Sequence, residues 1–178
     1  MMSNGHRLAV IDTNVPIVAN YAIKNSGQPD DLPTECISAC VETIAAVIKN
    51  KGLVIDSGDE IYVEYRTNCS LKGQPGLGDR FMKWVHDNRW KLPGKNRVAI
   101  TKNNGSYNEF PSHKGLSRFD RSDRKFVAVA NAHPVKPPIY QATDSKWWGW
   151  KDALDEAGIR VIFLCSEYIK KKYRKKAR

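Results

Sequence analysis

Short runs of hydrophobic residues alternate with longer stretches of helical spacing along most of this chain. Residues 8–11 are wholly apolar and end on Asp12, which is typical of a buried parallel strand that stops at the edge of a sheet. Apolar residues then follow helical spacing from 37 to 48, and Gly52 ends that helix before a second apolar run at 53–55. The first third of the chain is therefore predicted to form a strand, a helix and a second strand.

The same alternation returns in the last third of the chain. Residues 126–130 have helical spacing, residues 139–142 read as a strand, and residues 161–165 read as the last strand. Strands that alternate with helices indicate a mainly parallel sheet covered by helices on both faces. We therefore expect a three-layer α/β/α fold with about five strands.

Residues 69–118 interrupt this alternation. They are rich in Gly, Lys, Asn and Pro around one predicted helix at 78–88 and a short strand-like run at 98–101. We interpret the segment as an elaboration of a single domain that spans residues 1–169, because 178 residues are enough for one sizeable core.

The charge of the chain favours a polyanionic partner. Lys and Arg number 29 against 19 for Asp and Glu, which gives a formal net charge of +10. Seven basic residues lie within 170–178, and taking their charges from +10 leaves +3 for the body. The sequence predicts that this tail is a disordered polycation that strengthens RNA binding.

The four cysteines and the hydropathy of the chain favour a cytoplasmic protein. Cys36, Cys40, Cys69 and Cys165 form no CxxC pair and follow no signal peptide, so reduced thiols are expected. Cys36 and Cys40 lie one helical turn apart, but without a second Cys or His pair they are expected to pack in the core and not to bind a metal. No apolar run is long enough to span a membrane.

Four acids are predicted to converge although they lie far apart in sequence. Asp12 and Asp144 follow predicted strands, and the carboxyl ends of parallel strands meet at one edge of a sheet. Glu64 lies on the predicted helix after the second strand, and Asp123 lies near a helix start. Such a cluster requires neutralisation, for which Mg²⁺ or Mn²⁺ is suited, and a bound metal can activate water to attack a phosphodiester.

Each acid also has a purely structural interpretation. Asp12 and Asp144 are residue types that form turns, and Asp123 is suited to the positive end of a helix dipole. Glu64 on its own is typical of an exposed helix charge. The joint arrangement favours a functional site more than any single residue does.

The ordered acids, the opening Asp12-Thr13-Asn14-Val15, the helix start at 122–126 and the segment 142–147 together resemble the PIN-domain nucleases. The resemblance covers residues 8–165. It implies a five-stranded parallel sheet between helices and an Mg²⁺- or Mn²⁺-dependent endoribonuclease. The residues that it assigns to catalysis and metal binding are Asp12, Glu64, Asp123 and Asp144, with Asn14, Asp120 and Thr143 in support and Lys146, Arg124 and Lys125 toward the substrate.

The chain departs from the family pattern at two positions. Ala142 stands where the family often has Ser or Thr, and Lys146 stands where it often has a further acid. Lys146 is then expected to weaken metal binding or to contact a substrate phosphate. The second acid is the least secure assignment, because Glu60 lies one helical turn before Glu64.

Two other functions remain open from the sequence. A non-catalytic RNA-binding module would keep the fold and the basic surface, and Lys146 favours it. A phospho-acceptor regulator is disfavoured, because no suitable acceptor Asp follows an early acidic pair.

Trp147, Trp148 and Trp150 are suited to stacking on bases, but packing of a helix on the sheet is favoured. A protein inhibitor and a homodimer partner also remain possible.

Overall fold

A computed structural model describes residues 8–24, 27–72 and 75–177 of a mixed α/β protein. Its central element is a parallel sheet of three short strands in the order β1-β6-β7. They are β1 (Val10–Ile11), β6 (Ile139–Gln141) and β7 (Val161–Phe163), with Val10 opposite Ile139 and Ile139 opposite Val161. The strands predicted near both ends of the chain are confirmed, and the structure places them side by side in one sheet.

A second parallel pair joins β2 (Ile55–Asp56) to β3 (Arg97–Val98). An isolated parallel bridge between Ala9 and Leu53 brings the chain before β2 beside the chain before β1, where the amide of Ala9 donates to the carbonyl of Gly52 at 2.9 Å. The described residues therefore form a three-stranded and a separate two-stranded parallel sheet, and not the single sheet of about five strands that was predicted.

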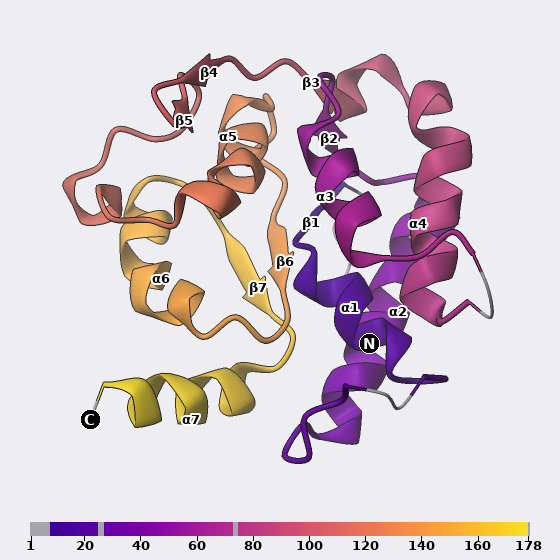
Figure 1. Ribbon diagram of the computed structural model, residues 1–178. Helices are drawn as coiled ribbons and strands as arrows, with labels where there is room; N and C mark the ends of the chain where they lie inside the picture. The colour runs from indigo at the N-terminus through magenta and orange to yellow at the C-terminus, as the bar shows by residue number, and fades with distance from the viewer. Residues whose placement is uncertain (1–7, 25–26, 73–74, 178) are drawn as a thin grey trace, which may run out of the picture.

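Seven α-helices surround these strands within the described residues. Figure 1 shows the first four helices gathered together, and α5 and α6 beside β6 and β7. Their bounds are α1 (Asn14–Asn20), α2 (Thr34–Asn50), α3 (Glu60–Asn68), α4 (Leu77–Asn88), α5 (Arg124–Ala132), α6 (Lys146–Glu156) and α7 (Ser166–Lys176). None of the helices described is long and apolar enough to cross a membrane.

The core forms where the periodic apolar residues predict it. Helix α2 buries Cys36, Ile37, Cys40, Ile44 and Val47, which share one face at helical spacing. The four cysteines are all buried and free. Core packing of Cys36 and Cys40 is therefore confirmed.

The segment 69–118 has more structure than its composition indicates. Helix α4 confirms the helix predicted there, and the short strands β4 (Lys102–Asn103) and β5 (Ser106–Tyr107) form an antiparallel hairpin. Its two turn residues, Asn104 and Gly105, both have positive φ (47° and 75°), as a type I′ turn requires. Four short 3₁₀ segments complete the connections, and they are Arg89–Lys91, Gly94–Asn96, Lys114–Leu116 and Arg121–Asp123.

The prediction that residues 170–178 are disordered is wrong for the part that the structure describes. Helix α7 continues to Lys176, whereas Arg178 lies outside the described residues. Tyr168 and Ile169 are buried on one face of this helix, and the ammonium of Lys172 pairs with Asp31 at 3.0 Å. The composition of the tail could not predict these contacts, because they are made with segments distant in sequence.

Candidate functional site

Asp12 follows β1 directly and lies in the interior of the protein. Its amide donates to the carbonyl of Tyr140 at 3.0 Å, which continues the pairing of β1 with β6. The side chain is 1% exposed, and its Oδ1 accepts hydrogen bonds from the backbone amide and the side-chain amide of Asn14 at 2.9 and 3.0 Å. Both donors are neutral, so a buried carboxylate stands here without a cationic partner among the described residues.

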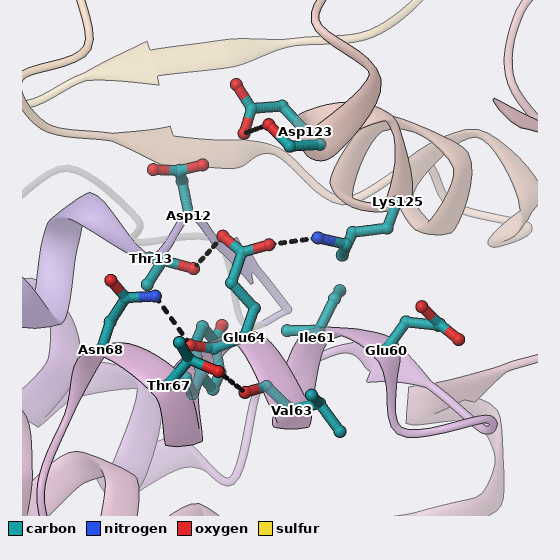
Figure 2. Close-up of polar contacts among 12 residues, drawn as sticks. Asp12, Thr13, Glu60, Ile61, Val63, Glu64, Thr67, Asn68, Asp123 and Lys125 are labelled. Carbon is teal, nitrogen blue, oxygen red and sulfur yellow. Dashed lines mark hydrogen bonds and ion pairs between the residues drawn. The ribbon is translucent and has the colours of Figure 1, made fainter. Parts of the chain in front are cut away.

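Glu64 reaches the same place from α3. Its Oε1 accepts a hydrogen bond from the hydroxyl of Thr13 at 2.6 Å, and its Oε2 pairs with the ammonium of Lys125 from α5. Glu64 and Lys125 are mostly buried, at 21% and 12% side-chain exposure. Figure 2 shows Glu64 between Asp12 and Lys125, with Asp123 close by.

Glu60, the alternative second acid, points elsewhere. In Figure 2 its side chain extends away from Asp12 and Asp123. Its Oε1 pairs with the ammonium of Lys102 on the β4–β5 hairpin at 2.6 Å. The geometry therefore favours Glu64 as the acid that belongs with Asp12.

Asp123 ends the 3₁₀ segment before α5, as predicted for an acid at a helix start. Its Oδ2 accepts a hydrogen bond from the indole N–H of Trp147 at 3.1 Å. Trp147 is fully buried and packs edge-on against Phe119 with ring centroids 5.0 Å apart. Trp148 packs against Phe163 and Trp150 against Phe119, so the packing interpretation of the three tryptophans is confirmed.

Asp144 follows β6 and lies near Asp123. Its Oδ1 accepts the backbone amide of Lys146 at 3.0 Å. The ammonium of Lys146 lies 2.5 Å from Oδ2 of Asp120, which also caps the 3₁₀ segment by accepting the amide of Ser122 at 3.1 Å. Lys146 thus neutralises Asp120, a residue expected to support the site.

The acids perturb one another electrostatically. Burial, together with the negative charge of Asp123, raises the pKa of Asp12 to about 7 against the opposing hydrogen bonds from Asn14. Burial, followed by the charges of Asp144 and Asp120, raises the pKa of Asp123 to about 6. The Lys146 ammonium lowers the pKa of Asp120 to about 2. Asp12 and Asp123 therefore carry negative charge that this environment disfavours.

Of the other residues predicted for the site, Asn14 contacts Asp12, whereas Arg124 contacts the hairpin. Asn14 links two loops, because its side-chain amide donates to Asp12 while its Oδ1 accepts from the hydroxyl of Thr143 at 3.4 Å. Arg124 faces away from the acids, since its guanidinium donates to Ser106 Oγ at 3.0 Å and to the carbonyls of Ser117 and Phe119. The position of Arg124 thus favours anchoring of the hairpin over contact with a substrate.

The roles of three residues at the site were not predicted from the sequence. The hydroxyl of Thr13 orients Glu64, and the indole of Trp147 orients Asp123. Gln141 at the end of β6 is fully buried, and its Oε1 accepts the amide of Asp144 at 3.3 Å while its Nε2 has no partner within the described residues. In the sequence, the only indication of this further polar group is that a Gln ends the predicted strand directly before Ala142-Thr143-Asp144.

The acids are neighbours but are not drawn together as a ligand set in this arrangement. Within residues 8–24, 27–72 and 75–177, no group of three His, Cys, Asp or Glu side chains is spaced to hold a metal ion. Two acids of this region are paired with lysines instead, Glu64 with Lys125 and Asp120 with Lys146.

Comparison with protein-family models, with curated proteins and with solved structures gave no match to this chain.

Proposed function

We propose that this protein is a divalent-metal-dependent endoribonuclease of the PIN-domain type. One observation carries the proposal, namely that Asp12, Glu64 and Asp123 come from three separate elements to one place and that Asp12 is buried there without a cationic partner among the described residues. Burying an unpaired carboxylate is costly, and proteins retain such groups mainly where they bind a cation or take part in chemistry.

The donor atoms of the site suit Mg²⁺ or Mn²⁺. Asp12, Glu64, Asp123 and Asp144 supply only carboxylate oxygens, which hard divalent cations prefer. Within the described residues, the side-chain hydrogen bonds of Asp12 and Asp144 fall on Oδ1 of each, so the two Oδ2 atoms are available as ligands. These residues would hold the ion, with Asn14, Thr13 and Trp147 fixing three of the carboxylates.

A bound divalent ion would supply an activated water and would stabilise the charge that develops on the scissile phosphate. The protein's own groups would orient the reacting parts. Asn14 holds Asp12 and Trp147 holds Asp123, so neither carboxylate needs to reorganise when substrate arrives. Lys146 carries a cation at the solvent-exposed side of the cluster, where it can also attract an RNA phosphate.

The fold supports the same proposal. The Ala9–Leu53 bridge gives the parallel strands one continuous order, β3-β2-β1-β6-β7, which fits a five-stranded sheet. Asp12 and Asp144 both follow strands of this order, at the carboxyl edge where open parallel sheets place their sites. We infer that helices on both faces complete a three-layer PIN-like domain.

RNA is the proposed substrate, and the cytoplasm is the proposed location. The net charge of +10 favours a polyanion, and the basic residues of α7 remain on the surface although that helix is ordered. Four free, buried cysteines are typical of a reducing compartment.

A second function is supported by the ion pairs. Because Lys125 pairs with Glu64 and Lys146 with Asp120, a protein that binds RNA without cleaving it is the alternative. In that protein lysines would replace the metal as counter-ions to the acids.

A cleavage assay separates the two functions. End-labelled single-stranded RNA is incubated with the protein in Mg²⁺, in Mn²⁺ and in excess EDTA, beside Asp12→Asn and the exposed control Asp155→Asn. We expect cleavage by the wild type and by Asp155→Asn with either metal, and almost none with EDTA or with Asp12→Asn. Undiminished cleavage in EDTA would contradict the metal mechanism, whereas RNA binding without cleavage under every condition would favour the alternative.

A further inference from the structure

A basic pocket lies beside the acids, between the β4–β5 hairpin and the start of α5. Its lining includes the side chains of Lys102, Arg121 and Lys125, together with the hydroxyl groups of Ser106 and Tyr107. Lys102 and Arg121 are exposed, so the pocket is open to solvent. These groups are donors of the kind that bind phosphate oxygens.

The charges of this pocket leave a positive excess. Glu60 is the acid in its lining, and it is matched by Lys102 at 2.6 Å. Lys125 is matched by Glu64. Arg121 forms no ion pair and donates no hydrogen bond to any group in the described part of the chain. One guanidinium is therefore left to attract an anion.

Arg121, on the 3₁₀ segment before α5, lies against the turn of the hairpin. Gly105 has a φ of +75°, and a Cβ added there would lie 3.2 Å from Nη1 of Arg121, so the guanidinium lies directly against the turn. Arg124 fixes the hairpin to α5 through Ser106 Oγ at 3.0 Å. The pocket is thus held together by two elements that are joined by a hydrogen bond.

The pocket shares a wall with the carboxylate cluster. Lys125 lines the pocket and also pairs with Glu64. Arg121 and Lys125 stand on either side of Asp123 in the sequence, Arg121 on the 3₁₀ segment that Asp123 ends and Lys125 in the first turn of α5. An anion held here would therefore lie next to the acids.

We propose that this pocket binds one phosphodiester group of single-stranded RNA next to the bond that is cleaved. The inference rests on the proposed function and adds to it the element that fixes the strand in the site. A phosphate within a strand fits better than a buried terminal phosphate, because Lys102 and Arg121 are exposed and the pocket is open to solvent. The β4–β5 hairpin, which lies within the elaboration at 69–118, is then part of the substrate site.

The test compares two arginines that carry the same charge. Arg121→Gln removes the unpaired cation of the pocket. Arg160→Gln is the control, because Arg160 is exposed and directly precedes β7, at the opposite end of the strands from Asp12 and Asp144. Binding of a fluorescent single-stranded RNA is followed by anisotropy in EDTA over a series of NaCl concentrations.

We expect Arg121→Gln to lower the magnitude of the log–log salt slope by about 0.7, which corresponds to about fivefold weaker binding at 0.1 M salt. Arg121→Lys should recover most of the affinity, and Arg160→Gln should stay within about twofold of wild type. Equal losses for Arg121→Gln and Arg160→Gln, or an unchanged slope for Arg121→Gln, would overturn the pocket.

Cleavage with Mg²⁺ by the same preparations separates this proposal from the proposed function. If the wild type cleaves RNA and Arg121→Gln binds RNA like Arg160→Gln, phosphate binding at the pocket is refuted and the proposed nuclease function is kept. If the wild type binds RNA without cleaving it, the nuclease is refuted, and a selective loss for Arg121→Gln still supports a phosphate at the pocket.

Discussion

Asp12→Asn is expected to stabilise the metal-free protein at neutral and alkaline pH while it removes activity. The carboxylate is 1% exposed and hydrogen-bonded by neutral amides, and its burial, followed by the negative charge of Asp123, raises its pKa to about 7. An asparagine keeps an oxygen that can accept the two bonds from Asn14. It carries no charge, so both the cost of burying a charge and the repulsion from Asp123 are removed.

The magnitude follows from proton linkage. The pKa of an aspartate side chain is ordinarily 3.8, and that of Asp12 in the folded protein is about 7, so the folded state binds more protons than the unfolded state between these pH values. Unfolding releases protons there, and the stability falls as the pH rises from about 4 to about 7. One pKa unit corresponds to about 1.4 kcal/mol, which gives a cost of roughly 4 kcal/mol for the ionised side chain above pH 7.

Part of this cost returns in the variant, because the new Nδ2 atom is buried and needs an acceptor of its own. We therefore expect Asp12→Asn to gain about 1 to 3 kcal/mol at pH 8 and little or nothing at pH 4. Urea unfolding in EDTA at both pH values measures this gain. The exposed control Asp155→Asn should change the stability by less than about 0.5 kcal/mol.

Addition of Mg²⁺ supplies the second part of the assay. The ion should raise the urea midpoint of the wild type at pH 8, because a ligand that binds only the folded state stabilises that state. The rise should be smaller for Asp12→Asn, which lacks one of the proposed metal ligands. The reasoning is refuted if Asp12→Asn is less stable than the wild type at pH 8, or if both proteins lose the same stability between pH 4 and pH 8.

Two further predictions concern the neighbours of Asp12. Glu64→Gln should lower the cleavage rate by about two orders of magnitude, since several kcal/mol of transition-state stabilisation depend on the metal site. Glu60→Gln should lower the rate by less than about tenfold, because Glu60 faces Lys102. Equal losses of rate for the two variants in single-turnover assays would contradict this geometry. Lys125→Met should destabilise the metal-free protein by about 1 to 3 kcal/mol by leaving Glu64 unpaired, and should tighten Mg²⁺ binding measured by calorimetry, because the competing cation is gone. Weaker Mg²⁺ binding by Lys125→Met would show that this lysine does not compete with the ion.

The turn of the β4–β5 hairpin has a sequence signature of its own. Asn104-Gly105 is the residue pair that type I′ turns favour, because both positions need positive φ. The flanking residues are polar, so the usual alternation of apolar and polar positions was missing. Its role beside the acids depends on Arg124, which ties it to α5.

Local sequence patterns were sufficient to predict several strands and helices of this protein. A wholly apolar run that ends on an acid is recognisable at β1, and helical spacing identified α2, α4 and α5, because burial of one face depends on residues within a few turns of each other. The placement of Asp123 at a helix start was likewise predictable from its neighbours.

Only the tertiary structure decided which side chains meet. Thr13 and Glu64 lie 51 positions apart and Lys125 and Glu64 lie 61 apart, so no local pattern indicated that Glu64 faces Asp12 while Glu60 faces the hairpin. The basic end of the chain is helical for the same reason, since Tyr168 and Lys172 find partners in distant segments. Charge and spacing set what each residue can do, and the long-range contacts set which residues act together.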